Sequence, residues 1–270
     1  MRKNSLFWGI ALLLAGGILL LEPLGVLTRL ELSAWQLIWP VFLVYLGIWV
    51  LLGFSRGQRR AVTDVCDLAI PCSGATAATI SLAFGAGTCS LSAGAAPGML
   101  VTGTCEGGAE SAVTQTPEGH VNLEVHSTEM MVGPWNWPTD AHRRWDLHVN
   151  DSLPITLQVK TGASDTHLDL TELKVTKLRI DSGASSTEIR LPAAAGYTEV
   201  RGSSGAASLK LFVPQGVAAR IRATGALSGI HIDRQRFPES EGIHVSPDFE
   251  STPNRVDIRL DVGVGSIEIR

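Results

Sequence analysis

Several motifs that mark enzymes and metal sites are missing from this 270-residue chain. It has no H-E-x-x-H pair for zinc, no G-x-S-x-G nucleophile turn and no C-x-x-C pair for metal or redox chemistry. After residue 60 it also lacks a long apolar stretch and any segment with convincing helical periodicity. These absences exclude the families that depend on such motifs, and they predict a protein that is not an enzyme and needs no cofactor.

The few cysteines and histidines do not form a recognisable ligand set either. The four cysteines are Cys66, Cys72, Cys89 and Cys105. Their spacing is not that of zinc ligands, so we expect reduced, buried thiols in a cytoplasmic domain or two disulfides in an exported one. His120 and His126 flank Glu124 on one face of a predicted strand. We interpret all three as ordinary exposed strand residues, with a metal site as the weaker alternative.

Two apolar stretches do occur, at residues 6–21 and 35–54. The second is uncharged and has the roughly 20 residues that a helix needs to cross a bilayer. The first continues weakly to residue 27, past Glu22 and Pro23. We therefore predict a transmembrane hairpin within residues 1–60, with spans at about 6–27 and 35–54, and we favour it over a cleaved leader.

Charge patterning predicts how the hairpin is oriented. The cations that flank the two spans are Arg2, Lys3, Arg56, Arg59 and Arg60. The connecting segment offers only Arg29, beside Glu31, so the positive-inside rule places the N-terminus and the rest of the chain in the cytoplasm. Residues 61–270 contain 16 basic and 24 acidic residues, a net charge of −8. Such a domain is a poor nucleic-acid binder and is repelled by anionic lipid.

The region after residue 60 contains an internal repeat. Gly162, Gly183, Gly205 and Gly225 are each followed by alanine and are spaced by 21, 22 and 20 residues. Alternating apolar residues precede and follow each glycine, as in a strand with one buried face. Outlying copies surround Gly85 and Gly263. Each Gly-Ala step predicts a tight bend that requires either a positive φ or the close approach of another backbone.

A period near 20 residues with two short strands per unit is typical of a stacked β-solenoid. An antiparallel β-sandwich or meander is the alternative, because its strands recur at similar spacing. We favour the solenoid, since the Gly-Ala step recurs at nearly constant phase. The predicted all-β part has an N-terminal region at 61–145 and the repeat at 146–270. Residues 234–254 interrupt the repeat as a long loop, with a short strand at 243–245.

These motifs carry a family resemblance that covers nearly the whole chain. In the anchor, Gly16-Gly17, Glu22-Pro23 and Trp39-Pro40 resemble the two-span region of LiaI/LiaF-like bacterial membrane proteins. Behind the anchor, the motifs around Gly85, Gly162, Gly183 and Gly263 are similar to the toast-rack family of β-repeat domains. The resemblance implies a regulator of cell-envelope stress signalling that acts on a membrane sensor kinase. It implies no catalytic residue.

Two sets of residues are candidates for contacts with partners. One loop, bounded by prolines, contains Trp135, Trp137, Arg143 and Arg144, which either cap the solenoid or anchor a protein interface. In the first span, Gly9 and Gly16 are seven residues apart and allow close helix packing, with a kinase or with a second copy. We therefore predict a membrane-anchored regulatory or scaffold protein. An adhesin or wall-associated protein with its β domain outside is the alternative.

Overall fold

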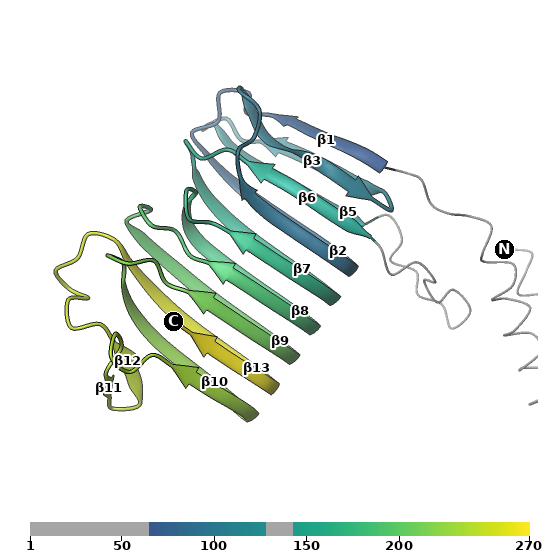
Figure 1. The fold of residues 1–270 in the computed structure, drawn as a ribbon. Coiled ribbons are helices and arrows are strands. Elements are labelled where there is room, and N and C mark those ends of the chain that lie inside the picture. The colour runs from purple at the N-terminus through teal and green to yellow at the C-terminus, as the bar shows by residue number, and fades with distance from the viewer. Residues whose placement is uncertain (1–64, 128–142) are drawn as a thin grey trace, which may run out of the picture. The chain divides into compact units, whose positions relative to one another are not determined.

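The computed structural model describes residues 65–127 and 143–270 (Figure 1). Within these ranges the chain forms strands and turns, and no helix there is long and apolar enough to cross a membrane. The predicted hairpin at 1–60 lies outside the described residues. The strands are β1 (Val65–Pro71), β2 (Ala77–Ala93), β3 (Met99–Glu106), β4 (Ala109–Gln115), β5 (His120–Ser127), β6 (Arg144–Val149), β7 (Pro154–Asp169), β8 (Lys174–Arg190), β9 (Tyr197–Phe212), β10 (Ala218–Ile232), β11 (Glu239–Ser240), β12 (Ile243–Val245) and β13 (Arg255–Ile269).

Each long strand folds back on itself. β8 follows β7 after only four residues, and the two pair in parallel from Pro154↔Lys174 to Asp169↔Arg190. The end of β7 therefore lies close to its own beginning. A straight 16-residue strand would be about 50 Å long, whereas the link to β8 spans at most about 18 Å. β7 must consequently bend, and Figure 1 shows the long strands folded in this way.

The bend lies at the Gly-Ala step predicted from the sequence. In β7 the buried side chains are Ile155, Leu157 and Val159 before Gly162, but Ser164, Thr166 and Leu168 after it. The inward face therefore changes from odd to even positions at the glycine. We call the residues before the bend the first arm and those after it the second arm. Apolar residues from both arms belong to one buried core.

Parallel pairing of the long strands confirms the stacked repeat. β2, β7, β8, β9, β13 and β10 are neighbours in that order, and every contact between them is parallel. The antiparallel sandwich or meander is therefore wrong for these strands, and among described residues antiparallel pairs occur only toward the two ends of the sheet. The short strand expected at 243–245 is present as β12.

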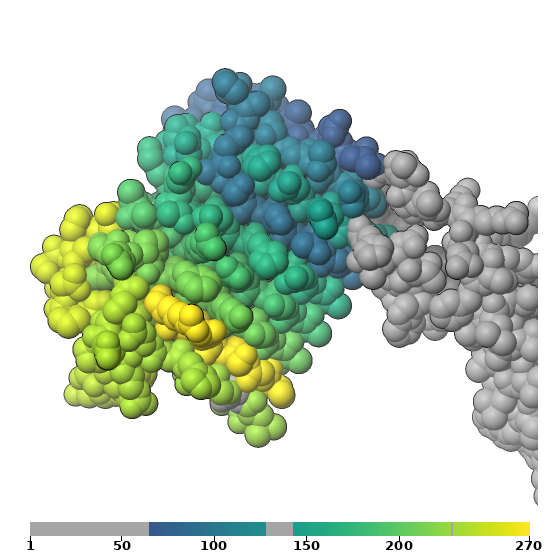
Figure 2. All heavy atoms as spheres, in the orientation of Figure 1, coloured from purple at the N-terminus to yellow at the C-terminus, as the bar shows by residue number. Residues whose placement is uncertain are grey.

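Spatial order departs from chain order at both ends of the stack. β13, the last strand of the chain, lies between β9 and β10, and Figure 2 shows it as a yellow band with green neighbours. At the other end, β5 pairs with the first arm of β2 and β6 pairs with its second arm. β5 and β6 thus lie beside the two arms of the same strand.

Close approach of adjacent backbones explains most of the bend glycines. Gly85, Gly162, Gly183, Gly205 and Gly263 lie in register across the sheet. A Cβ atom on Gly162 would lie 2.4 Å from the carbonyl oxygen of Gly85, and one on Gly263 would lie 2.7 Å from that of Gly205. Gly183 and Gly205 have no positive φ, so steric exclusion by the preceding coil is the reason for glycine there.

One bend position differs from the expected pattern. In β10 the register places Ala226, not Gly225, beside Gly263. β10 is the last long strand in the stack, and only Arg220 and Ile221 pair with a further strand, β12. Unlike the inner coils, this one has no further long strand stacked on its outer side.

Candidate interaction surface

A ladder of charged side chains covers the outer face of the first arms in β8, β9, β13 and β10. One row consists of Lys177, Glu199, Asp257 and Arg220, and a second row, two residues further along each strand, consists of Arg179, Arg201, Arg259 and Arg222. We call these eight residues the charge ladder. Inward side chains such as Leu178 and Ile258 alternate with them and are fully buried. Because successive side chains of a strand point to opposite faces, burial of the inward residues places the ladder residues on the outer face.

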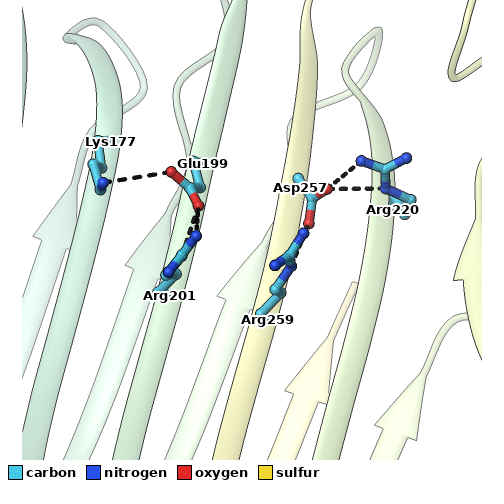
Figure 3. Close-up of polar contacts among 6 residues, drawn as sticks. All are labelled: Lys177, Glu199, Arg201, Arg220, Asp257 and Arg259. Carbon is cyan, nitrogen blue, oxygen red and sulfur yellow. Dashed lines mark hydrogen bonds and ion pairs between the residues drawn. The ribbon is translucent and has the colours of Figure 1, made fainter.

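Ion pairs connect the rungs of the charge ladder (Figure 3). Lys177 Nζ lies 3.6 Å from Glu199 Oε2, and the Nε atom of Arg201 donates to Glu199 Oε1 at 2.6 Å. On the other side, Arg220 Nε donates to Asp257 Oδ2 at 2.9 Å and Arg259 Nε lies 3.4 Å from Asp257 Oδ1. Each carboxylate therefore bridges cations of its own and a neighbouring strand.

Burial differs sharply between these two carboxylates. The side chain of Asp257 is 3% exposed, whereas that of Glu199 is 24% exposed. The Arg220 guanidinium covers the Phe249 ring, 4.9 Å from its centroid, so the loop before β13 helps to shield the pair. The hydrogen bond to Asp257 raises the pKa of Arg220, against the opposing effect of desolvation. The Asp257 end of the ladder is thus a fixed structural pair and the Glu199 end is open.

The open end of the charge ladder borders a polar depression. Its volume is about 290 Å³, and it is lined by Thr156, Gln158, Lys160, Lys177, Arg179 and Asp181. Arg179 is oriented by a 2.9 Å hydrogen bond from its Nε to Asp181. Arg222, in contrast, is exposed and makes no ion pair with any described residue. Oriented guanidinium groups of this kind recognise carboxylates and phosphates in pairs of hydrogen bonds.

Sequence reasoning missed the charge ladder, although a signal for it is present. In β8, β9, β13 and β10 an arginine stands four residues before the bend position, with a charged residue two positions earlier. The motifs are Lys-Leu-Arg, Glu-Val-Arg, Asp-Ile-Arg and Arg-Ile-Arg. Such residues become neighbours only when the register of the strands is fixed, and the aligned bend glycines fix it.

The candidate residues from the sequence fall into three groups. Trp135, Trp137, Gly9 and Gly16 lie outside the described residues. Arg144 starts β6 and is exposed, while the Arg143 carbonyl accepts a 2.8 Å hydrogen bond from the Thr88 amide. These two arginines are separated from the charge ladder by the intervening coils. Trp145, the next residue, belongs to the core: it is 0% exposed, and its ring centroid lies 5.0 Å from that of Phe84.

The predicted strand face with His120, Glu124 and His126 is present in β5. His120 Nε2 lies 2.9 Å from the hydroxyl of Thr79, so this histidine has a hydrogen-bond partner within the sheet. In residues 65–127 and 143–270, no three His, Cys, Asp or Glu side chains lie together in a way that could hold a metal ion.

The four cysteines are free thiols. Burial raises the pKa of Cys89 to about 12, with a smaller contribution from Cys105, and burial likewise raises the pKa of Cys105 to about 12. Both thiols therefore stay protonated and unreactive at neutral pH. Cys66 and Cys105 are directly opposite each other in the β1–β3 pair. Opposed positions have Cα separations compatible with a disulfide, so this pair would report an oxidising compartment.

Two protein-family models match this chain, one at its N-terminal part and one over most of its β domain. Residues 3–72 match the LiaF transmembrane domain, and residues 59–212 match the N-terminal domain of toast_rack, DUF2154. The crystal structure of a proposed cell adhesion protein from Clostridium sporogenes ATCC 15579 has a TM-score of 0.70 and 17% identity, covering 76% of this chain and 98% of that one. At this identity the likeness shows the fold alone. No curated protein matches. The chain therefore belongs to the toast-rack family and has the LiaF-like architecture of a transmembrane domain followed by a toast-rack domain.

Proposed function

We propose that this protein is a membrane-anchored, non-enzymatic regulator or scaffold that acts on a cell-envelope stress sensor kinase. The observation that carries the proposal is the LiaF transmembrane domain directly followed by a toast-rack domain. The anchor keeps the β domain close to membrane partners, and the charge ladder offers oriented arginines to an acidic protein surface. Charged ladders of this kind give specificity and orientation more than raw affinity.

The transmembrane part of this proposal predicts a loss of partner binding when the first span is made bulky. Gly9→Leu combined with Gly16→Leu should abolish co-purification with the sensor kinase or with a second copy, because leucine prevents close backbone approach. Membrane insertion and β-domain folding should be unchanged. Ala11→Leu, on nearly the opposite helix face, is the matched control and should retain the partners. A double leucine variant that keeps every partner would reduce the anchor to a tether.

The soluble part predicts a loss of kinase binding when the two arginines at the ends of the second ladder row are neutralised. Arg179→Gln with Arg222→Gln should weaken kinase co-purification about thirtyfold, since each lost charge-assisted contact contributes on the order of 1 kcal/mol. Arg190→Gln, on the second arm, removes an equally exposed arginine with carboxylate partners and should have no effect. Equal binding by the two variants would place the contact elsewhere.

A topology measurement separates this function from adhesion. We expect a periplasm-dependent reporter fused after residue 60 to be silent, and all four cysteines of the denatured protein to be alkylated without reductant. The proposed cell adhesion protein of similar fold favours the second candidate, an adhesin with the β domain outside. An active reporter together with a Cys66–Cys105 disulfide would establish that topology instead.

A further inference from the structure

The folded strands create an uncharged edge along the stack, which we call the bend edge. It consists of the bend residue and the residue after it in β2, β7, β8, β9, β13 and β10, positions that are exposed or half-buried. None of these positions is charged in any of the six strands, although residues 61–270 have a net charge of −8. Glycine and alanine predominate there. This edge therefore differs in chemistry from both outer faces of the arms.

Apolar size increases along the bend edge toward β10. The position after the bend is occupied by Ala163, Ala184 and Ala206 in the middle coils, then by Val264 and Leu227. Val264 is 52% exposed and Leu227 is 77% exposed. Packing does not require these two side chains, because they point away from the core. Leu227 and Val264 are paired across β10 and β13, so these two exposed aliphatic side chains lie side by side on the edge.

The chain enters the domain at this same edge. Val65, the first residue of β1, is opposite Glu106 and next to the Gly107–Gly108 turn that joins β3 to β4. It is itself 54% exposed. Ten residues separate it from Phe54, the end of the predicted second span. Ten residues reach at most about 35 Å, so a span that ends at Phe54 would keep the β1 end of the domain within that distance of the lipid headgroups.

We propose that the bend edge rests on the lipid surface, with Leu227 and Val264 inserted among the lipids. Two aliphatic side chains give too weak a contact for a free domain, but the tether supplies a high effective concentration. Because the domain is acidic, the contact should be stronger on zwitterionic than on anionic lipid. The inference is independent of the proposed regulatory function and of the side of the membrane that the domain occupies.

The test uses the full-length protein in single-copy nanodiscs of zwitterionic lipid that carry a nitroxide headgroup. In a background with Cys66→Ala and Cys72→Ala, a fluorophore is attached at Ala206→Cys on the bend edge or at Ala194→Cys in the β8–β9 connection. Both alanines are exposed, but they lie at opposite ends of the arms. We expect strong quenching at position 206, weak quenching at 194, and less quenching at 206 on anionic discs.

A second comparison tests the apolar contact itself. Leu227→Ser with Val264→Ser should lower quenching at position 206 to the level at 194, with an unchanged β-sheet signal. Tyr197→Ser, which removes a 47% exposed apolar side chain at the start of β9, should have no effect. Equal quenching at 206 and 194, or quenching that survives the serine substitutions, would overturn the proposal. In larger discs that hold two labelled copies, energy transfer between the copies without lipid quenching would overturn the proposal and assign the edge to self-association.

Discussion

Replacing Gly265 with alanine should destabilise the β domain more than any other glycine-to-alanine change at the bends. The residue has φ +140°, and an added Cβ would lie 1.9 Å from the carbonyl oxygen of Ala207 in the neighbouring strand. Backbone strain and overpacking therefore add, and we expect a loss of about 3–4 kcal/mol in the free energy of unfolding. The measurement is urea denaturation of the full-length chain in detergent, with unfolding monitored through the far-UV circular dichroism signal of the β-sheet.

Two further variants separate these contributions. Gly162→Ala meets an oxygen at 2.4 Å but has no positive φ, so it should lose about 2 kcal/mol through overpacking alone. Gly216 has φ +81° and nothing within 4 Å of an added Cβ, so Gly216→Ala should cost about 1 kcal/mol through backbone strain. If Gly216→Ala proved as damaging as Gly265→Ala, steric contact between coils would not be what requires glycine at the bends.

Removing the guanidinium of Arg220 is expected to have the second largest effect. Arg220→Met keeps the apolar stem beside Phe249 but leaves the buried Asp257 carboxylate with only the 3.4 Å contact to Arg259. A buried carboxylate that loses its main donor typically costs a few kcal/mol, and since Arg220 is 35% exposed we expect about 2 kcal/mol. The same urea denaturation measures it.

The control for this variant comes from the open end of the charge ladder. Lys177 and Glu199 form a 3.6 Å pair in which the lysine is half exposed, so Lys177→Met should cost less than about 0.5 kcal/mol. The double variant Arg220→Met, Asp257→Leu should recover most of the lost stability, because it removes the unpaired carboxylate as well. No recovery would indicate that Asp257 stabilises the fold through Arg259 instead.

The repeat was predictable because its physical causes are local. Alternating apolar residues around Gly162, Gly183 and Gly205 predicted two buried arms and a bend, and the core and register agree. The order of the coils was not predictable, since nothing in the residues around Gly263 says that β13 enters between β9 and β10. That choice depends on pairing between residues 37 apart in β10 and β13 and 58 apart in β9 and β13.

The candidate interaction surface was less predictable than the fold. A single segment such as 177–181 has the pattern of an ordinary solvated strand face. Its charged residues form rows with those of other strands only when the neighbouring strands are aligned. Trp135 and Trp137 were predicted as cap or interface residues because aromatic side chains are common there. The alternating charges at Lys177 and Arg179 led to no such prediction. Leu227 and Val264 were likewise counted as part of the repeat, because a sequence does not show that their coils place them at an exposed edge.

The position of β13 also determines when the domain can be completed during synthesis. β10 pairs along its whole length with β13, so neither β9 nor β10 acquires that partner until residues 255–269 have been synthesised. Domains generally fold from the N-terminus as they emerge, and here the earlier coils can assemble while β10 waits. A chain truncated before residue 255 would thus have two unpaired sheet edges, which quality-control proteases can recognise as incomplete.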